Sequence, residues 1–570
     1  MSVETVKSAD AGTIRKKRKG RQKGRTVDLN ELLLIQNLLG EDLHDRSLLI
    51  EHLHTLQKHF GYLTSSALVA LAHAMKLAPA EVYEVATFYH HFDVVKDGES
   101  APPALTVRVC DSISCEMSGS HALIKKLRES LGESVRVQAV PCVGRCHSAP
   151  IAIVGENPIE HANPSNVQLQ VTKGSVTDTL TPDYMSAESY VESGGYSFYH
   201  QCVNREYKES DVIARLQDSS LRGLGGAGFP AGIKWEIVRG QADPKIMAVN
   251  VDEGEPGTFK DRVYLEQNPH RFFEGMLIAA WAVGIDEVYI YIRDEYPTCL
   301  KILKTELLKL QTMPVMKLPA IHFRRGAGSY ICGEESAMIE SIEGKRGIPR
   351  LRPPYVAEVG LFGRPTLEHN FETLYWVPEI LQKGSDWFAS QGRNGRKGLR
   401  SFSVSGRVKT PGVHLAPAGI TLRELIYEYC GGMLDGHTLY GYFPGGASGG
   451  MLPASLADIP LDFDTLQAHG SFIGSAAVIV LSEHDSARQA ATNAMRFFAN
   501  ESCGQCTPCR VGTSKAAEMM ESDHWNLEIL EDLCQVMEDA SICGLGQAAP
   551  NPLRSLIRYF PQELDLQEDS

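Results

Sequence analysis

The sequence lacks a segment that could cross a membrane. Among its 570 residues, no apolar run approaches the ~20 residues that a membrane-spanning helix needs. The N-terminal region is charged and no apolar segment follows it, so it does not fit a secretory signal. We therefore expect a cytoplasmic protein with no direct membrane insertion.

An excess of positive charge is also missing. The formal net charge of −14 argues against a nucleic-acid-binding protein, so we expect no nucleic acid partner. Basic residues gather only at the N-terminus, where nine of the first 25 residues are Lys or Arg. We expect residues 1–27 to form a solvated, disordered basic tail. The alternative is a docking arm for an acidic partner subunit.

The sequence has thirteen cysteines and lacks a secretory signal. Without an oxidising compartment, metal ligands or buried thiols are favoured over disulfides. Eight cysteines form two groups of four. The other five are expected to be small buried hydrophobic residues: Cys202, Cys299, Cys332, Cys430 and Cys534.

The C-terminal group carries the strongest signal in the chain. Cys503, Cys506 and Cys509 are spaced by three residues, and Cys543 follows from a distance. Three thiolates in a tight turn plus one from elsewhere can each bind one corner of a [4Fe–4S] cluster. The alternative is a tetrahedral zinc site, which usually takes paired Cys-x-x-Cys arms.

The N-terminal group of cysteines follows two expected strands. Residues 105–109 alternate as a strand that ends at Cys110, and a loop then carries Cys115. Residues 135–139 alternate again and end at Cys142, with Cys146 in the next loop. If the two strands are neighbours, the four thiolates converge. Their spacing suits a [2Fe–2S] cluster, with zinc or disulfides as the alternatives.

Helical periodicity dominates residues 28–98. Apolar residues fall on one face of residues 45–61, with Asp45 as a plausible N-cap and Gly61 as a stop. Residues 64–77 repeat the pattern, and a third helix opens at Pro79. Residues 176–205, rich in Ser, Gly, Tyr and Pro, are expected to form a linker.

A glycine-rich loop at residues 221–235 has five glycines in ten residues, followed by Lys234. Such a loop lets backbone N–H groups approach an anion, so it suits a phosphate cradle; a plain glycine turn is the alternative. It is not a Rossmann fingerprint, because no strand precedes it. Strands and helices then alternate as in an α/β fold, with polar loops where such folds bind cofactors.

These motifs resemble a known family. Residues 222–234, 250–260, 326–335 and 365–374, together with the C-terminal cysteines, are similar to the NADH-binding flavoprotein subunit of respiratory complex I. Residues 30–175 resemble that complex's small thioredoxin-like [2Fe–2S] subunit. The fusion resembles the diaphorase subunit of NAD-reducing hydrogenases and the β subunit of NAD-dependent formate dehydrogenases. Residues 249–261, 293–297 and 405–417 look closest to the latter.

The resemblance implies a multidomain α/β fold. It consists of a helical bundle (28–98), a thioredoxin-like [2Fe–2S] domain (99–175), a Rossmann-like FMN/NAD-binding α/β domain (206–395), a β-grasp, SLBB-like domain (396–484) and a helical [4Fe–4S] domain (485–570).

The resemblance also implies site residues for FMN and NAD(H). The FMN residues are Gly223, Gly225, Gly226, Lys234, Asn250, Asp252, Glu253, Tyr330, Gly333, Glu334, Asn370 and Thr373. The NAD(H) residues are Phe229, Glu255 and Glu335. The chain departs from the family pattern at Leu224, Ile237, Arg352, Tyr355 and His369.

The implied function is hydride exchange between NAD(H) and FMN, coupled to one-electron transfer through the clusters. FMN carries the hydride, so no catalytic acid or base is expected. The expected partner is a large molybdenum- or tungsten-pterin formate dehydrogenase subunit with further iron–sulfur clusters. The alternatives are a hydrogenase diaphorase, a respiratory NADH dehydrogenase, or a zinc-stabilised scaffold protein.

Overall fold

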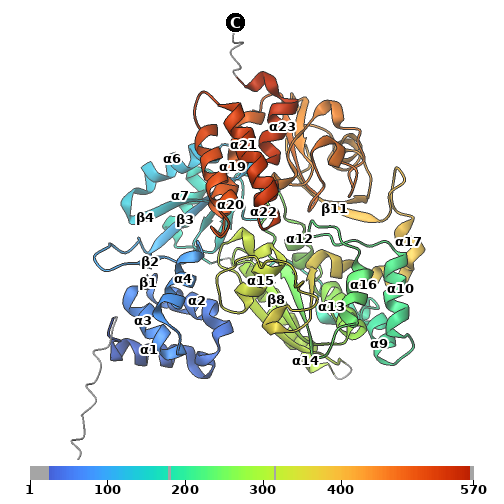
Figure 1. Ribbon diagram of the computed structural model, residues 1–570, viewed down its shortest axis with the longest axis horizontal. Helices are drawn as coiled ribbons and strands as arrows, with labels where there is room; N and C mark the ends of the chain where they lie inside the picture. The colour runs from blue at the N-terminus through green and yellow to red at the C-terminus, as the bar shows by residue number, and fades with distance from the viewer. Residues whose placement is uncertain (1–24, 178–180, 314–315, 565–570) are drawn as a thin grey trace, which may run out of the picture.

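The computed structural model describes residues 25–177, 181–313 and 316–564. Most of the expected basic tail, residues 1–27, lies outside this range. Figure 1 shows the N-terminal helices and the first cysteine-bearing sheet on one side, the central α/β domain below, and the C-terminal helices above. The expected multidomain α/β fold is confirmed. No helix in the described ranges is long and apolar enough to cross a membrane.

The N-terminal domain is a small helical bundle. Its helices and its two-stranded parallel sheet are α1 (Leu29–Leu39), α2 (Leu49–Phe60), α3 (Ser65–Met75), α4 (Pro79–Phe88), β1 (Leu63–Thr64) and β2 (Val94–Val95). Asp45 is an N-cap as expected: its side chain accepts the Ser47 N–H, and the 3₁₀ turn Arg46–Leu48 leads directly into α2, which begins at Leu49. Gly61 ends α2 as expected, in the left-handed conformation that glycine tolerates best.

The second domain is a four-stranded sheet of order β4-β3-β5-β6. Its elements are β3 (Leu105–Cys110), β4 (Val135–Val140), β5 (Ala152–Val154), β6 (Asn157–Ile159), α5 (Ile113–Met117), α6 (Ser120–Leu131) and α7 (Pro164–Lys173). Because β3 and β4 pair in parallel, their carboxyl ends lie at the same edge of the sheet. Cys115 was expected in a loop but lies in the short helix α5.

The central domain has an all-parallel sheet of order β10-β7-β8-β9. The strands are β7 (Lys245–Val251), β8 (Ile285–Ile292), β9 (Ala320–Arg325) and β10 (Thr366–Asn370). The helices are α8 (Ala187–Glu192), α9 (Ser197–Val203), α10 (Glu209–Asp218), α11 (Ala231–Arg239), α12 (Lys260–Gln267), α13 (Pro269–Val283), α14 (Pro297–Thr312), α15 (Glu335–Ile342), α16 (Phe371–Lys383) and α17 (Ser385–Ala389).

The two faces of this sheet belong to different cores. Met247 and Val249 of β7 pack in the core that contains α13 and α16, while Ile246 and Ala248 pack in a core shared with the N-terminal helices. This follows from the two-residue period of a strand, which sends alternate side chains to opposite faces. The N-terminal domain is therefore joined to the central domain by apolar packing.

Part of the expected linker is folded into the central domain. The segment holding α8 and α9 places Tyr190, Tyr196 and Phe198 in the core beside α13. Tyr190 donates to the buried carboxylate of Glu274, and Tyr196 contacts His270. The Ser, Gly and Pro residues of this segment favour a linker, and its sequence does not show that its aromatic residues are buried.

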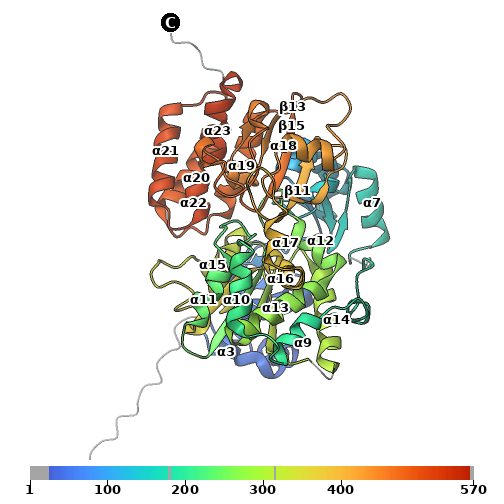
Figure 2. The same cartoon turned by 90° about the vertical axis from the view of Figure 1, so that its right-hand side faces the viewer.

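The last two domains complete the chain. A mixed sheet of order β12-β11-β15-β13-β14 is built from β11 (Leu399–Gly406), β12 (Gly412–Pro417), β13 (Leu439–Phe443), β14 (Leu452–Pro453) and β15 (Ala477–Ser482), with α18 (Leu422–Glu424) continuing as a π-helical turn. The C-terminal helices are α19 (Ala487–Glu501), α20 (Thr507–Met520), α21 (Leu527–Ala540), α22 (Gly544–Ala548) and α23 (Asn551–Tyr559). Figure 2 shows them packed beside the mixed sheet.

Candidate flavin, nucleotide and iron–sulfur sites

A cavity of about 440 Å³ opens at the carboxyl end of β7. Three domains line it. The central domain contributes the glycine-rich loop and the carboxyl ends of β7 and β10. The mixed-sheet domain contributes Gly445, Ser448, Phe472, Gly474 and Ser475, and α22 contributes Gly544, Leu545 and Ala548. Fourteen of the fifteen residues expected to bind FMN or NAD(H) line this cavity. The exception is Thr373, which is buried and accepts the Leu224 N–H at 2.9 Å, so it supports the loop from behind.

Polar contacts hold the loop after β7 in place. The side chain of Asn250 donates to the carbonyl of Gly333 at 2.8 Å and accepts the Asp252 N–H at 3.0 Å. One carboxylate oxygen of Asp252, Oδ2, is buried without a hydrogen-bond partner in the described residues. An unsatisfied buried oxygen is costly, so it fits a site that a donor group of a ligand completes.

Burial shapes the charge of this loop. It raises the pKa of Asp252 to about 8, partly opposed by Arg293. Burial and the nearby Asp261 raise the pKa of Glu253 to about 7. Glu255 accepts from the Ser448 N–H at 2.8 Å and from the Tyr330 hydroxyl, although burial raises its pKa.

The opposite wall of the cavity carries paired charges. Burial opposes the charge of Lys234, but Glu368 and Glu335 outweigh it and raise the Lys234 pKa; its Nζ lies 2.8 Å from a Glu368 carboxylate oxygen. Glu334 caps α15 and also pairs with Arg352, which lies 2.8 Å from Glu335. Glu368 and Ser448 were not predicted as site residues, because no local sequence pattern marks a residue that another element brings to a site.

The glycine-rich loop closes tightly over this cavity. Gly226 and Gly228 have φ angles of 134° and 67°, which side-chain-bearing residues rarely adopt. A Cβ atom on Gly225 would lie 2.9 Å from the Cβ atom of Asn370. The loop therefore presents backbone to the cavity, as a phosphate cradle requires.

His369 fills the place of an expected asparagine. Its Nε2 accepts the indole N–H of Trp235 at 2.8 Å, and burial followed by the charge of Lys234 lowers its pKa well below the usual value. The imidazole is therefore neutral, with Nδ1 carrying the proton. A neutral donor beside the cradle is compatible with an anionic ligand there.

The N-terminal cysteines converge as expected. Cys110, Cys115, Cys142 and Cys146 are all buried, and the sulfur atoms of Cys142 and Cys146 are 3.2 Å apart. Contact with Cys115 and Cys142 raises the pKa of Cys110, while contact with Cys110 and Cys146 lowers the pKa of Cys142. Four thiols in such close contact suit a site that binds iron as thiolates.

The C-terminal cysteines lie at helix ends. Cys503 follows α19, Cys506 precedes α20, Cys509 lies in its first turn and Cys543 precedes α22. Burial raises the pKa of Cys509 to about 11 and the pKa of Cys543 to about 12. Cys506 and Cys543 are the N-cap residues of α20 and α22, a position where the helix dipole favours negative charge.

The cavity at the carboxyl end of β7 and the C-terminal cysteines are adjacent. Glu501, at the end of α19, accepts the Tyr330 N–H at 2.7 Å, and the rings of Tyr330 and Phe497 are 5.0 Å apart. Leu545 and Ala548 of α22 line the cavity itself. The helices that carry these cysteines thus also shape the cavity.

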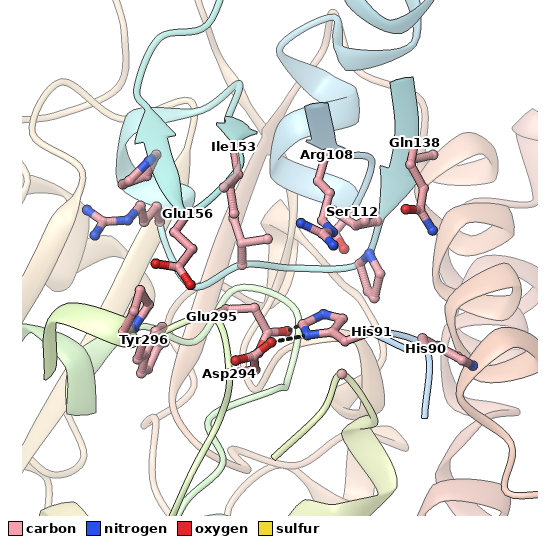
Figure 3. Close-up of a pocket in the computed structure, with 18 of the residues that line it drawn as sticks. His90, His91, Arg108, Ser112, Gln138, Ile153, Glu156, Asp294, Glu295 and Tyr296 are labelled. Atoms are coloured by element: carbon pink, nitrogen blue, oxygen red, sulfur yellow. Dashed lines mark hydrogen bonds and ion pairs between the residues drawn. The ribbon is translucent and has the colours of Figure 1, made fainter. Parts of the chain in front are cut away.

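A second cavity, of about 530 Å³, lies where the domains meet. Figure 3 shows Arg108 and Ser112 pointing into it from the cysteine-bearing sheet domain, opposite His91 and Asp294. His91 Nδ1 lies 2.6 Å from an Asp294 carboxylate oxygen. None of the fifteen residues expected to bind FMN or NAD(H) lines this second cavity, so the two cavities are separate sites.

Family comparisons match each region of the chain. Residues 216–379 match the Nuo51 FMN-binding domain, and residues 35–173 match the thioredoxin-like [2Fe–2S] ferredoxin. Residues 489–567 match the NADH-ubiquinone oxidoreductase-F iron–sulfur binding region, and residues 401–452 match the SLBB domain. The chain thus contains an FMN/NADH-binding domain and binding regions for both clusters, and zinc is not needed to explain the cysteines.

Whole-chain comparisons agree. The chain is 39% identical over 397 residues to an NADH-quinone oxidoreductase subunit of Rhizobium meliloti, covering 67% of this chain and 94% of that one. An NADH-quinone oxidoreductase subunit of Aquifex aeolicus is 39% identical over 396 residues, covering 67% and 91%. A crystal structure of an NAD⁺-reducing [NiFe]-hydrogenase in the H₂-reduced state has a chain with a TM-score of 0.80 and 31% identity, covering 92% and 94%.

Proposed function

Because the chain belongs to the family of complex I 51 kDa-type NADH-binding flavoprotein subunits, we propose that it is the NAD(H)-reacting subunit of a cytoplasmic, NAD-dependent formate dehydrogenase. The family itself gives an NADH-binding diaphorase subunit with iron–sulfur clusters, working within a larger complex. The finer proposal adds the partner: a molybdenum- or tungsten-pterin subunit that oxidises formate to CO₂.

The observation that carries this proposal is the convergence of three segments on the [2Fe–2S] domain. They are the segments that resemble the formate dehydrogenase β subunit: 249–261, 293–297 and 405–417. Phe259 of the first packs against Cys142, and Arg293 of the second donates to the Cys142 carbonyl. Ser405 of the third hydrogen-bonds Ser114 at 2.9 Å. The resemblance therefore lies in the residues that join the fused domains.

The proposed roles in the flavin cavity follow from its two walls. When bound, FMN exchanges a hydride with the nicotinamide nucleotide and single electrons with iron–sulfur clusters. We assign the phosphate end to the glycine-rich loop and Lys234, supported by the tight backbone turn in that loop. Asn250, Asp252 and Glu253 are assigned to the ribityl and ring region, where Asp252 has an oxygen free to accept.

The nucleotide is assigned to the mouth of the cavity. Phe229 is 46% exposed there, which leaves its ring free to pack against a nicotinamide or adenine ring. Glu335 is paired with Arg352, so the two can exchange partners when a nucleotide enters. No side chain is assigned as acid or base, because hydride exchange requires positioning rather than proton transfer by the protein.

A hydrogenase diaphorase is the second candidate. The NAD⁺-reducing hydrogenase chain matches the fused architecture nearly end to end, whereas the quinone oxidoreductase relatives match over 67% of this chain. No residue in the described ranges is assigned to bind formate or hydrogen, since either would be bound by the partner.

The test is to isolate the complex from its native cells without oxygen. NAD⁺ reduction would be assayed with formate and, separately, with hydrogen, and the metals of the partner chain measured. We expect formate-dependent activity with molybdenum or tungsten. Hydrogen-dependent activity with nickel would overturn the formate assignment and leave the family assignment unchanged.

A further inference from the structure

Two buried arginines of the central domain contact the loop that carries Cys142 and Cys146. Arg293, which follows β8, donates from Nη2 to the Cys142 carbonyl at 2.7 Å. Arg262, in α12, donates from Nε to the Gly144 carbonyl at 2.9 Å. The side chains of Arg293 and Arg262 are 5% and 4% exposed. We call this arrangement the arginine clamp.

The same clamp reaches the flavin cavity. Arg293 also donates to the backbone carbonyl of Glu253, and Tyr296 donates its hydroxyl to the Glu253 carboxylate at 2.9 Å. Gly144 has a φ of 70°, and a Cβ atom there would lie 2.0 Å from the Tyr296 hydroxyl oxygen. The loop of the [2Fe–2S] site is therefore connected through Arg293 and Tyr296 to Glu253, which lines the cavity at the carboxyl end of β7.

Each arginine of the clamp also pairs with a carboxylate. Arg293 pairs with Glu295 at 2.8 Å, and Arg262 pairs with Glu266 at 2.6 Å. Figure 3 shows Glu295 beside His91 at the edge of the second cavity. Because the Arg293 guanidinium is the group that reaches the Cys142 carbonyl, the positive member of the Arg293–Glu295 pair is the one that faces the cysteines.

We propose that the Arg293–Glu295 pair sets the reduction potential of the [2Fe–2S] cluster, and that Arg293 does so through its positive charge at the Cys142 loop. This inference rests on the proposed function only in taking these four cysteines as the cluster's ligands. One-electron reduction adds one negative charge to a cluster. A positive charge held at a buried, poorly screened position stabilises the reduced form, and a negative charge does the reverse. Arg293 thus raises the potential, and Glu295 limits that rise.

The test is a redox titration of the intact holoprotein, with dithionite as the reductant and the [2Fe–2S] electron paramagnetic resonance signal as the readout. Arg293→Gln removes the positive charge and leaves Glu295 with His91, whose Nε2 lies 3.9 Å away, as its remaining partner. We expect the ratio of reduced to oxidised cluster at a fixed potential to fall about tenfold, a shift of about 59 mV for one electron. Glu295→Gln should raise the ratio.

The double variant separates charge from structure. With both side chains neutral, the ratio should return to within about threefold of the parent protein, because the two charges are removed together. Shifts in the same direction for Arg293→Gln and Glu295→Gln would overturn the proposal, since disruption of the loop, rather than charge, would then explain both.

Two further variants keep the test decisive. Arg400 is 4% exposed and pairs with Asp462 at 2.8 Å, not with a residue of the arginine clamp, so Arg400→Gln should leave the potential unchanged. If Arg293→Gln loses the cluster, Arg293→Lys, which keeps the charge, should retain the cluster at a potential near that of the parent protein.

An unchanged potential in Glu295→Gln would overturn the proposal on its own. A complete absence of a [2Fe–2S] signal in the parent holoprotein would instead remove the cluster assignment itself.

Discussion

The two cysteine sites differ in how the rest of the protein surrounds them. Cys110, Cys115, Cys142 and Cys146 are at most 5% exposed, and Phe259 of the central domain packs against the last two. Cys503, Cys506 and Cys543 are only partly buried. The [2Fe–2S] site is thus enclosed between domains, whereas the [4Fe–4S] site lies close to the surface of the C-terminal helices.

The difference indicates which of the two cysteine sites a partner protein can approach. A protein that docks on the C-terminal helices comes close to Cys503 and Cys506, while the central domain blocks approach to the enclosed thiols. Because the flavin cavity touches both regions, through Tyr330 on one side and Glu253 on the other, we infer that it is where their electron paths meet.

The largest expected effect is the loss of one site with retention of the other. Cys506→Ala removes a ligand of the surface site, so the [4Fe–4S] signal and electron transfer to the partner should be abolished, while the [2Fe–2S] signal stays. Iron content, labile sulfide and electron paramagnetic resonance spectra check this. A surviving [4Fe–4S] signal would show that Cys506 is not a ligand.

Enclosure should also control the rate of iron loss. With a ferrous chelator such as bathophenanthroline, we expect the [4Fe–4S] signal to decay at least about tenfold faster than the [2Fe–2S] signal, since access to the enclosed iron requires the [2Fe–2S] and central domains to separate. Parallel decay measured on one sample would contradict the comparison.

A smaller effect is expected from weakening the enclosure. Tyr296→Phe removes the donor to Glu253, which should cost about 1–3 kcal/mol because a buried carboxylate loses a partner. Denaturant unfolding and [2Fe–2S] retention are the measurements. Tyr559→Phe, which loses a bond to the His469 carbonyl near the C-terminal helices, is the matched control and should leave the [2Fe–2S] site intact.

The smallest effect is expected for the loop after β7, which carries Asp252, in protein without bound cofactor. The pKa of Asp252 is raised to about 8, so the folded state holds its proton more strongly than the unfolded chain. The folded state is therefore stabilised less by this group at pH 8 than at pH 7, because the unfolded chain gains by releasing the proton. From pH 7 to 8 the loss should be about 1 kcal/mol. Asp252→Asn should reduce the pH dependence of unfolding by about this amount, leaving the smaller contribution of Glu253, when unfolding is measured at both pH values.

Local pattern was enough to place the cysteines. The strand alternation before Cys110 and Cys142 predicts that four thiols meet at one edge; the structure pairs these strands in parallel and places the Cys142 and Cys146 sulfur atoms 3.2 Å apart. The glycine-rich loop likewise lines the flavin cavity. Both succeed because the information lies within a few residues of the site.

Long-range contacts could not be predicted. Arg262 and Arg293 look like ordinary surface arginines until folding places them on the Cys142 loop, more than a hundred residues away in sequence. The buried aromatic residues of the expected linker were hidden for the same reason, since burial depends on the partner surface of α13. Amino-acid composition does not show which distant residues come into contact.

The fusion of the [2Fe–2S] domain to the central domain changes how strong their contact needs to be. Two domains on one chain meet at an effective concentration that is on the order of millimolar for a short flexible linker. A contact with a dissociation constant of about 1 mM would then stay closed about half of the time, whereas separate chains at micromolar concentration would be almost wholly apart. Covalent connection therefore makes the closure of these domains over the enclosed cysteines independent of the concentration of the protein.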